Sequence, residues 1–416
     1  MKNILYLIIL IPIIIFSQEE INISGYVKSA NSGETLIGAN VIVKELNVGC
    51  TTNNYGFFSF TIVEGEYTLE TSYIGYETKK INISQSVNNL IFNLSQTSYL
   101  TEEVVLKAKK EDANVKNADM GKIELDVEQI DQIPVLMGEK DILKTIQLLP
   151  GIQSGSEGSS GFYVRGGGPD QNLILLDEAV VYNASHLFGF FSVFNSDAIN
   201  NIDLIKGSMP ANYGGRLSSV LDINMKDGNN KKYQVDGGIG LLSSRLTIQG
   251  PVQKEKSSFI VSGRRTYIDV LSKPFMSKDS PFNGSGYYFY DLTTKINYRI
   301  SDKDRLYLSG YFGRDVFNFG NTDNGIGIEI PWGNATTSLR WNHLFNDKLF
   351  MNTSLIFSDY RFEFNIAQSE FELKIFSGIN DWNTKVDFLY QPNQRHTIKF
   401  GSNYTYHEFT PGNASG

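Results

Sequence analysis

Gly161-Phe162-Tyr163-Val164-Arg165-Gly166-Gly167-Gly168-Pro169-Asp170-Gln171-Asn172 stands near the middle of the chain, before an apolar run at residues 173–176 and Asp177. Three successive glycines can adopt backbone angles that are closed to other residues, and Pro-Asp favours a turn. The apolar run is typical of a short buried strand that ends in a polar turn. The sequence therefore predicts a region of short strands joined by tight, glycine-dependent turns.

A glycine-rich phosphate-binding loop is the alternative interpretation of these glycines. No Gly-Lys-Ser/Thr follows them, and no Gly-x-Gly-x-x-Gly opens a helix, because Pro169-Asp170 turns the chain instead. A packed structural turn is therefore the favoured interpretation of residues 165–171, with ligand contact as the weaker alternative.

Further short motifs lie on both sides of the glycines. They are Leu149-Pro150-Gly151-Ile152, Leu175-Leu176-Asp177, Ile205-Lys206-Gly207 and Tyr213-Gly214-Gly215-Arg216. Together with Val164-Arg165-Gly166-Gly167, and in this order, they resemble the plug domain of TonB-dependent outer-membrane receptors of the Bacteroidetes type. The resemblance implies an α+β plug at residues 118–230. The apolar spacing within residues 141–149 predicts a short helix there, which Pro150-Gly151 ends. The motif residues of the plug would be Arg165, Gly166, Gly167, Gly168, Asp177, Lys206, Gly207, Tyr213, Gly214, Gly215 and Arg216.

Histidine and aromatic side chains follow the apolar run of the plug. His186, Phe188, Phe190 and Phe191 are expected in the plug core or between plug and barrel, in preference to ligand contact. The other histidines are His343, His396 and His407, and none of the four stands in a metal-ligand spacing.

The composition favours β structure and offers no catalytic chemistry. The chain has 416 residues, with 22 Tyr and 27 Phe, and a net charge of −8 that gives no support for nucleic-acid binding. Its one cysteine, Cys50, excludes an intramolecular disulfide and a cysteine-based metal site. We therefore expect no catalytic residues, no metal and no cofactor.

The first residues have the pattern of a secretory signal. Lys2 precedes an apolar run at residues 4–16, and the small residue Ser17 comes before Gln18. The run is too short for a comfortable membrane span, so a signal peptide at residues 1–17 is favoured over an uncleaved anchor. The absence of any later long apolar run predicts that the mature protein could cross a membrane only with strands.

Residues 18–97 predict a small β-sandwich. Short β-prone segments at residues 23–27, 39–43, 57–62, 67–73, 80–83 and 90–94 alternate with Gly- and Asn-containing turns. Gly33-Glu34-Thr35-Leu36-Ile37-Gly38 and Thr52-Asn53-Asn54-Tyr55-Gly56 make it similar to the carboxypeptidase regulatory-like domain that often precedes these plugs. A spacer or docking role is favoured.

A short extended segment follows, within a linker at residues 98–117. Leu100, Thr101, Glu102, Glu103, Val104, Val105 and Leu106 are β-prone and adjoin the charged residues 107–112. Such a segment suits strand addition to a partner's sheet edge. It resembles the TonB box, and its position upstream of the plug favours that interpretation over a plain interdomain strand.

Residues 231–416 alternate apolar and polar side chains over long stretches. Leu292, Ile296 and Ile300 share one face, and Asp291, Lys295 and Arg299 share the other. This pattern predicts transmembrane strands of about 14 residues, which exceed the 5–6 residues usual in globular sheets. Expected short turns lie at residues 301–304, 346–348 and 391–395, and long loops at 272–286, 319–331 and 365–378. Residues 240–244 and Gly250-Pro251 are expected as two further turns.

The expected fold class is mostly β: a small β-sandwich, an α+β plug, and the first nine strands of an incomplete transmembrane antiparallel β-barrel. The resemblance implies a barrel of 22 strands, since nine could not enclose a plug. Residues 411–416 are expected as a polar outer loop. The sequence is therefore expected to be an N-terminal fragment of a longer receptor.

The resemblance implies energy-coupled uptake of a bulky, scarce nutrient at the outer membrane of a Gram-negative cell. The implied partners are the TonB energy-coupling complex, outer-membrane lipid and an extracellular small ligand of the siderophore, cobalamin, glycan or peptide class. A surface lipoprotein lid stays open as a further partner. The alternatives are a ligand-sensing signalling receptor and a secreted multi-domain surface adhesin.

Overall fold

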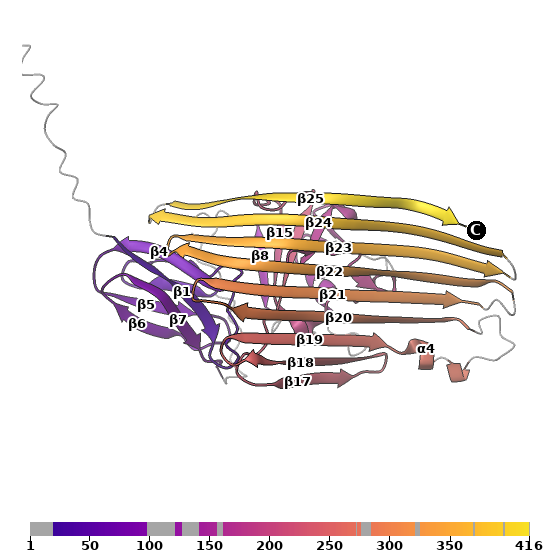
Figure 1. The fold of residues 1–416 in the computed structure, drawn as a ribbon, viewed down its shortest axis with the longest axis horizontal. Coiled ribbons are helices and arrows are strands. Elements are labelled where there is room, and N and C mark those ends of the chain that lie inside the picture. The colour runs from indigo at the N-terminus through magenta and orange to yellow at the C-terminus, as the bar shows by residue number, and fades with distance from the viewer. Residues whose placement is uncertain are drawn as a thin grey trace, which may run out of the picture.

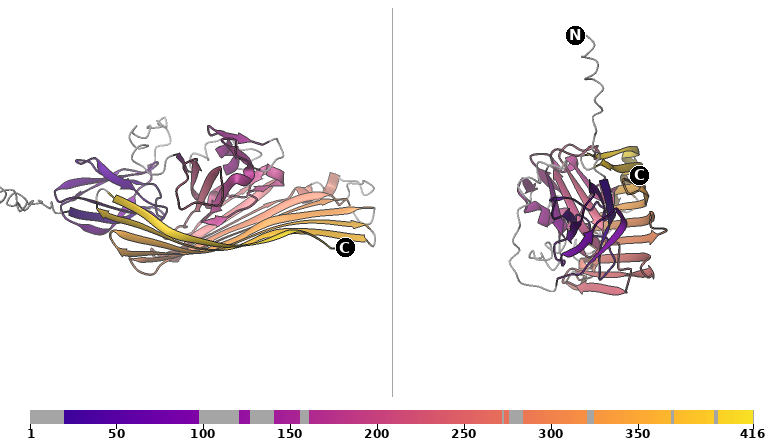
Figure 2. Two further views of the ribbon diagram at one scale, coloured as in Figure 1. Left: turned by 90° about the horizontal axis from the view of Figure 1, so that it is seen from above. Right: turned by 90° about the vertical axis from the view of Figure 1, so that its left-hand side faces the viewer.

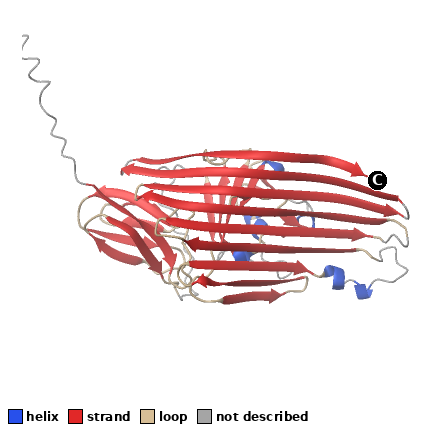
Figure 3. Ribbon diagram, in the orientation of Figure 1, coloured by secondary structure: helices blue, strands red, loops and turns tan. Residues whose placement is uncertain are grey.

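The computed structural model describes residues 20–97, 121–126, 141–155, 161–271, 273–275, 284–320, 325–368, 371–393 and 396–415. These residues form an N-terminal domain, a central region and a nine-stranded sheet (Figure 1). The secondary structure is mainly strand (Figure 3), as the composition predicts. No helix among the described residues has the length and apolarity needed to cross a membrane.

The N-terminal domain consists of two small sheets. One has the order β4-β1-β7, and the other has the order β3-β2-β5-β6. The strand bounds are β1 (Glu20–Ser29), β2 (Asn40–Val43), β3 (Val48–Thr51), β4 (Phe57–Val63), β5 (Tyr67–Ser72), β6 (Lys79–Ile83) and β7 (Val87–Leu94). Their inward residues, among them Ile23, Val41 and Phe58, form one apolar core between the sheets. Strand β3 is the one strand here that the sequence pattern missed, because Gly and Cys are weak strand signals.

The central region is built on a five-stranded sheet with the order β12-β11-β16-β15-β8. Its strands are β8 (Lys122–Asp126), β11 (Asn172–Leu176), β12 (Ala179–Val180), β15 (Ile199–Lys206) and β16 (Ser219–Met225). The helix α3 (Ile142–Gln147) covers the core of this sheet with Ile142 and Ile146 and is capped by Asp141, whose side chain accepts a hydrogen bond from the Lys144 amide. Small hairpins complete the region: β9 (Ile152–Ser154) with β10 (Phe162–Val164), and β13 (Ser185–His186) with β14 (Phe191–Ser192).

Nine antiparallel strands pair in sequence order to form the large sheet. They are β17 (Gln234–Ile239), β18 (Ser243–Gln253), β19 (Ser257–Thr266), β20 (Gly286–Arg299), β21 (Asp304–Phe319), β22 (Gly327–Asn346), β23 (Leu349–Gln368), β24 (Phe371–Asn393) and β25 (His396–Ser415). A short helix α4 (Ile268–Leu271) follows β19. The predicted number of strands is confirmed within the described residues.

The two faces of the large sheet differ as the alternation predicts. The central region lies against one face (Figure 2), and the N-terminal domain lies at the end where β20 and β21 connect (Figure 1). Asp291, Thr293 and Lys295 are buried on the covered face, whereas Leu292, Ile296 and Tyr298 are about 40% exposed on the other. The uncovered face is apolar and aromatic, which suits contact with lipid.

Four expectations about connections are wrong. Gly250-Pro251 lies inside β18, and the turn comes at residues 254–256. The expected loop at 365–378 is mostly strand, because β23 and β24 continue past the apolar alternation. β22 likewise begins within the expected loop at 319–331, and β25 includes residues 411–415. Polar strand extensions look like loops in sequence, because an aqueous environment on both faces imposes no alternation.

Candidate functional site: the contact between the central region and the large sheet

The glycine-rich turn is a tight hairpin connection. Val164 and Gly167 exchange both backbone hydrogen bonds, of 3.2 and 2.9 Å, around Arg165 and Gly166. These two residues have φ of 49° and 85°, the left-handed conformation that two-residue hairpins require. Gly167 packs so closely on Ser218 that a Cβ there would lie 2.4 Å from its Oγ, and that hydroxyl donates to the Val164 carbonyl over 2.8 Å. Gly168 precedes the 3-10 turn of Pro169–Gln171.

Lys206 and Gly207 lie beside this turn. The Lys206 ammonium donates to the Pro150 carbonyl over 2.6 Å, and a Cβ on Gly207 would lie 2.7 Å from the Arg165 guanidinium. The Arg165 amide donates to the Gly151 carbonyl over 3.0 Å. Three motifs that are distant in sequence therefore converge on one backbone junction.

Asp177 connects the central region to the large sheet. It follows β11 directly and has the left-handed conformation, and its Oδ1 accepts from the Met225 amide over 2.9 Å. Its Oδ2 is 2.9 Å from Arg340 Nη2 on β22 and 3.3 Å from Lys295 Nζ on β20. Burial alone would raise the pKa of Asp177, but the two cations outweigh burial and hold it below the ordinary value. Asp177 is therefore a buried anion that attaches to two strands of the sheet.

Glu178 and Tyr182 extend this attachment along the sheet. Glu178 accepts from the Asn352 amide over 3.0 Å and from the Ser354 hydroxyl, both on β23. The Tyr182 hydroxyl donates to Asp381 on β24. Neither residue is singled out by the sequence, since these partners on β23 and β24 are more than 170 residues away.

His186 forms a second buried attachment. Its Nδ1 lies 2.7 Å from Asp315 Oδ2, and its Nε2 lies 3.1 Å from Asp291 Oδ2. The ring stacks on Phe289 at 3.8 Å between centroids. Burial lowers the pKa of His186, but the two carboxylates outweigh burial and raise it, so the imidazolium is the stabilised form. Arg264 balances the remaining charge at 2.7 Å from Asp291.

The motif of residues 213–216 lies on the same side of the central region. The Tyr213 hydroxyl donates to Asp222 over 2.8 Å, and Lys385 of β24 lies 5.9 Å from the Tyr213 ring. Gly215 has φ of 79°, and Arg216 lies 6.0 Å from the Tyr182 ring. Within this motif, Tyr213 is anchored inside the central region, while Gly214 and Gly215 face open space.

The structure thus brings the motif residues into two groups. Arg165, Gly166, Gly167, Lys206 and Gly207 form the turn junction, and Asp177, Tyr213 and Arg216 lie along the large sheet. The segment Leu100, Thr101, Glu102, Glu103, Val104, Val105 and Leu106 lies outside the described residues. Among the residues that the structure does describe, no group of three or more His, Cys, Asp and Glu side chains could hold a metal ion.

Comparisons with protein families identify two parts of the chain. Residues 23–106 match the family described as CarboxypepD_reg-like domain, and residues 124–219 match the TonB-dependent Receptor Plug Domain. The chain is also 27% identical over 128 residues to TonB-dependent receptor P3 of Formosa agariphila, an alignment that covers 29% of this chain and 13% of that protein.

Two solved structures share the fold. The outer membrane transporter YddB from Escherichia coli has a TM-score of 0.52 and 12% identity, over 69% of this chain and 48% of that protein. The copper transporter OprC also has a TM-score of 0.52, with 10% identity, over 71% of this chain and 47% of that protein. This chain therefore spans about half the length of these transporters, and its nine-stranded sheet corresponds to part of their barrels.

Proposed function

Because the chain carries the CarboxypepD_reg-like domain, the plug and barrel strands of a TonB-dependent receptor, we propose that it takes part in energy-coupled uptake across the outer membrane. TonB-dependent receptors are transporters and not enzymes, and the homologues are outer-membrane proteins. The proposed cargo is a bulky, scarce nutrient of the siderophore, cobalamin, glycan or peptide class. The proposed partners are the TonB energy-coupling complex, outer-membrane lipid, the extracellular ligand and a surface lipoprotein lid.

The observation that carries the proposal is the plug's attachment to the sheet through buried polar contacts. Asp177 with Arg340 and Lys295, and His186 with Asp291 and Asp315, hold the plug without covalent bonds. Leaving one member of such a pair buried without its partner costs about 3–5 kcal/mol, so these contacts disfavour partial displacement of the plug. An external source of work would be needed to move it.

The fold offers a place where such work could act. Residues 100–106 lie between β7 and β8, and each of these strands is at the edge of its own sheet. An edge strand is hydrogen-bonded on one side only, so a pull on the linker would load the two strands that are easiest to separate. We propose Leu100, Thr101, Glu102, Glu103, Val104, Val105 and Leu106 as the segment that pairs with TonB.

The proposed sequence of events begins with ligand on the outer side of the plug. Ligand contact makes the linker accessible, TonB adds a strand to it, and force peels β8 from β15. This step breaks the ion pair between the Lys122 ammonium of β8 and the buried Asp203 carboxylate of β15, which are 2.9 Å apart. We further propose the turn of Arg165, Gly166, Gly167 and Gly168, with Lys206, Gly207, Tyr213, Gly214, Gly215 and Arg216, as the structural frame of the part that stays folded.

Binding of the purified receptor to the periplasmic domain of the host's TonB tests the coupling segment. Val104→Pro removes a backbone donor and disfavours strand pairing, so we expect binding to fall by about tenfold or more. Lys109→Pro, in the adjacent charged run, is the matched control and should bind like wild type. Equal binding of the Val104→Pro variant would overturn the assignment of this segment.

A further inference from the structure

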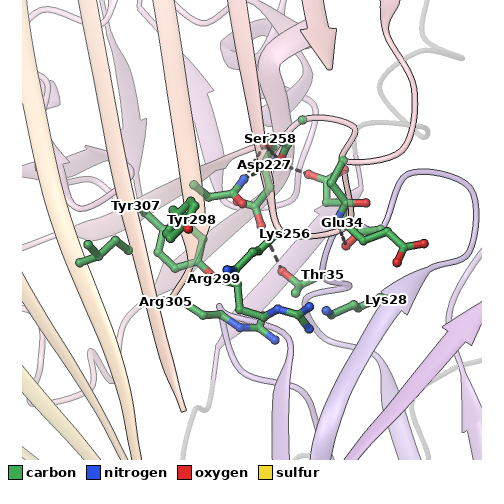
Figure 4. A pocket seen from close by; sticks show the side chains of 16 residues that line it. Lys28, Glu34, Thr35, Asp227, Lys256, Ser258, Tyr298, Arg299, Arg305 and Tyr307 are labelled. Carbon is green, nitrogen blue, oxygen red and sulfur yellow. Dashed lines mark hydrogen bonds between the residues drawn. The ribbon is translucent and has the colours of Figure 1, made fainter. Parts of the chain in front are cut away.

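A pocket lies where the N-terminal domain meets the plug and the large sheet (Figure 4). Its wall includes Lys28 of β1, Lys256 of the β18–β19 turn, Arg299 of β20 and Arg305 of β21. The pocket has a volume of about 30 Å³. On this measure one water needs about 10–15 Å³, so the space suits a small ion better than an organic substrate.

The positively charged side chains of this pocket lie close together, although like charges repel one another. Arg299 and Arg305 are direct cross-strand partners in the β20–β21 pair, a placement that is destabilising for like charges. Lys28 approaches from the N-terminal domain, and Figure 4 shows the three side chains gathered at one end of the pocket. The pKa of Lys28 is lowered to about 7, first by burial and then by Arg305 and Arg299.

The carboxylates that line the pocket are those of Glu34, Asp227 and Glu255, and the direct partners of the first two are other groups. Asp227 Oδ1 is 2.9 Å from Lys295 Nζ, and its Oδ2 accepts from the Thr35 hydroxyl over 3.4 Å. Glu34 Oε1 accepts from the Asp227 amide over 2.8 Å and from Asn200 over 3.0 Å. Within the described part of the chain, Lys28, Lys256, Arg299 and Arg305 form no salt bridge with a carboxylate. Asp227 and then the exposed Asp302 act to raise the pKa of Lys28, but burial, Arg305 and Arg299 lower it by more.

Arg305 supplies a second, independent indication of a missing partner. The side chain is only 8% exposed, and its Nε has no hydrogen-bond partner among the described residues. The guanidinium carbon of Arg305 lies 3.6 Å from the centre of the Tyr26 ring, and its side chain also hydrogen-bonds with Tyr307, so the Nε is the donor left without an acceptor. A buried guanidinium nitrogen without an acceptor is costly, and an oxyanion would satisfy it.

We propose that this pocket binds a phosphate-class oxyanion, which joins the N-terminal domain to the barrel by neutralising Lys28, Arg299 and Arg305 together. The oxygens of such an ion match the fork of donors on an arginine and accept from lysine at the same time. The bound ion would hold the N-terminal domain against the plug and the large sheet. Free phosphate and the phosphate of a lipid headgroup share this chemistry, and Lys256 lies 5.4 Å from the ring of Tyr298 on the uncovered, apolar face.

The test measures thermal stability of the purified receptor in a maltoside detergent, with and without millimolar sulfate. Sulfate is preferred to phosphate because it does not titrate near neutral pH. We expect sulfate to stabilise the wild type and to bind about tenfold or more weakly to Lys28→Gln and Arg299→Gln. Lys80→Gln and Arg361→Gln change exposed charges outside the pocket and serve as matched controls.

Two further readouts separate the proposal from simple loss of folding. Without any oxyanion, Arg299→Gln should be at least as stable as wild type, because it removes a like-charge pair. Sulfate affinity should also decrease as pH rises through about 7, where Lys28 loses its proton and Glu34, in the same pocket, becomes negatively charged. The part of this decrease that persists in Glu34→Gln is the contribution of Lys28. A folded Lys28→Gln variant that binds sulfate like wild type would overturn the proposal.

A second experiment determines whether the bound oxyanion is free in solution or part of a lipid headgroup. The receptor is placed in nanodiscs of phosphatidylglycerol, without sulfate or phosphate in the buffer. Stabilisation there that disappears in Arg299→Gln would assign the site to a lipid headgroup, whereas stabilisation by sulfate in detergent alone would assign it to a free oxyanion. No stabilisation in either arm would refute the site. The measurement needs no transport, so its failure and failure of the proposed uptake are distinguishable.

Discussion

The attachment of the plug to the large sheet depends on the charge of His186. His186 lies between Asp291 and Asp315, and both ring nitrogens are engaged. The sequence predicts an interior or plug-to-barrel position for this histidine, which the structure bears out. Its partners are 105 and 129 residues away, and no local pattern in a sequence connects residues at such separations.

We expect His186→Asn to weaken plug attachment by about 3 kcal/mol, because it leaves two buried carboxylates without their shared cation. A spectroscopic label at Ala211→Cys, in a Cys50→Ser background, would report plug release in urea. In wild type the attachment should be strongest below pH 6.5 and decline as pH rises through the raised pKa of His186. His396→Asn, at the exposed rim, is the control, and an unchanged midpoint in His186→Asn would contradict the role of this pair.

Glu34 gives the N-terminal domain its own pH dependence. Its pKa is raised to about 7, first by burial and then by the charge of Asp227. A carboxyl group with a raised pKa binds a proton more readily in the docked state. Docking should therefore be strongest below about pH 4.5 and weaken by up to about tenfold per pH unit as pH rises through about 7.

Distances between spin labels at Lys80→Cys and Lys303→Cys, again without Cys50, would measure the docked fraction. Glu34→Gln should remove the dependence between pH 4.5 and 7, since it cannot ionise. A docked fraction that increases with pH between pH 4.5 and 7 in the wild type would show that Glu34 is not the controlling group in that range.

The hairpin turn at residues 164–167 gives a matched test at the level of the element. Gly166→Ala meets no atom within 4 Å and costs only backbone strain, of about 1 kcal/mol. Gly167→Ala would place a Cβ 2.5 Å from that of Ser218 and displace the hydroxyl that binds Val164. We expect the second variant to lower the urea midpoint of the plug clearly more than the first. Equal effects would mean that backbone strain, and not close packing on Ser218, explains why this turn requires glycine.

The strands illustrate what sequence periodicity can and cannot predict. Alternation predicts nine strands and the face of residues such as Asp291 and Leu292, because one side contacts the plug and the other is apolar. It fails where β23, β24 and β25 extend beyond the apolar pattern. There the ladder of backbone hydrogen bonds continues while the side chains no longer carry the signal.

At the scale of the whole molecule, the N-terminal domain, plug and sheet contact one another. Tyr26 and Phe57 of the N-terminal domain pack with Phe350 of β23, and Ser59 donates to the Asp347 carbonyl over 2.5 Å. The sequence predicts a separate sandwich with a spacer or docking role, but it does not predict where this sandwich contacts the large sheet. Surface aromatics and turn residues carry no sequence signal for the partner they meet.

Growth competition in the native host tests the central claim of energy-coupled uptake. Strains that carry chromosomal Val104→Pro, Lys109→Pro or a deletion of the gene would be compared on limiting siderophores, cobalamin, glycans and peptides. The account predicts that the Val104→Pro strain fails on the same nutrient class as the deletion strain, while Lys109→Pro grows like wild type. Normal growth of Val104→Pro on a nutrient that the deletion strain cannot use would contradict it.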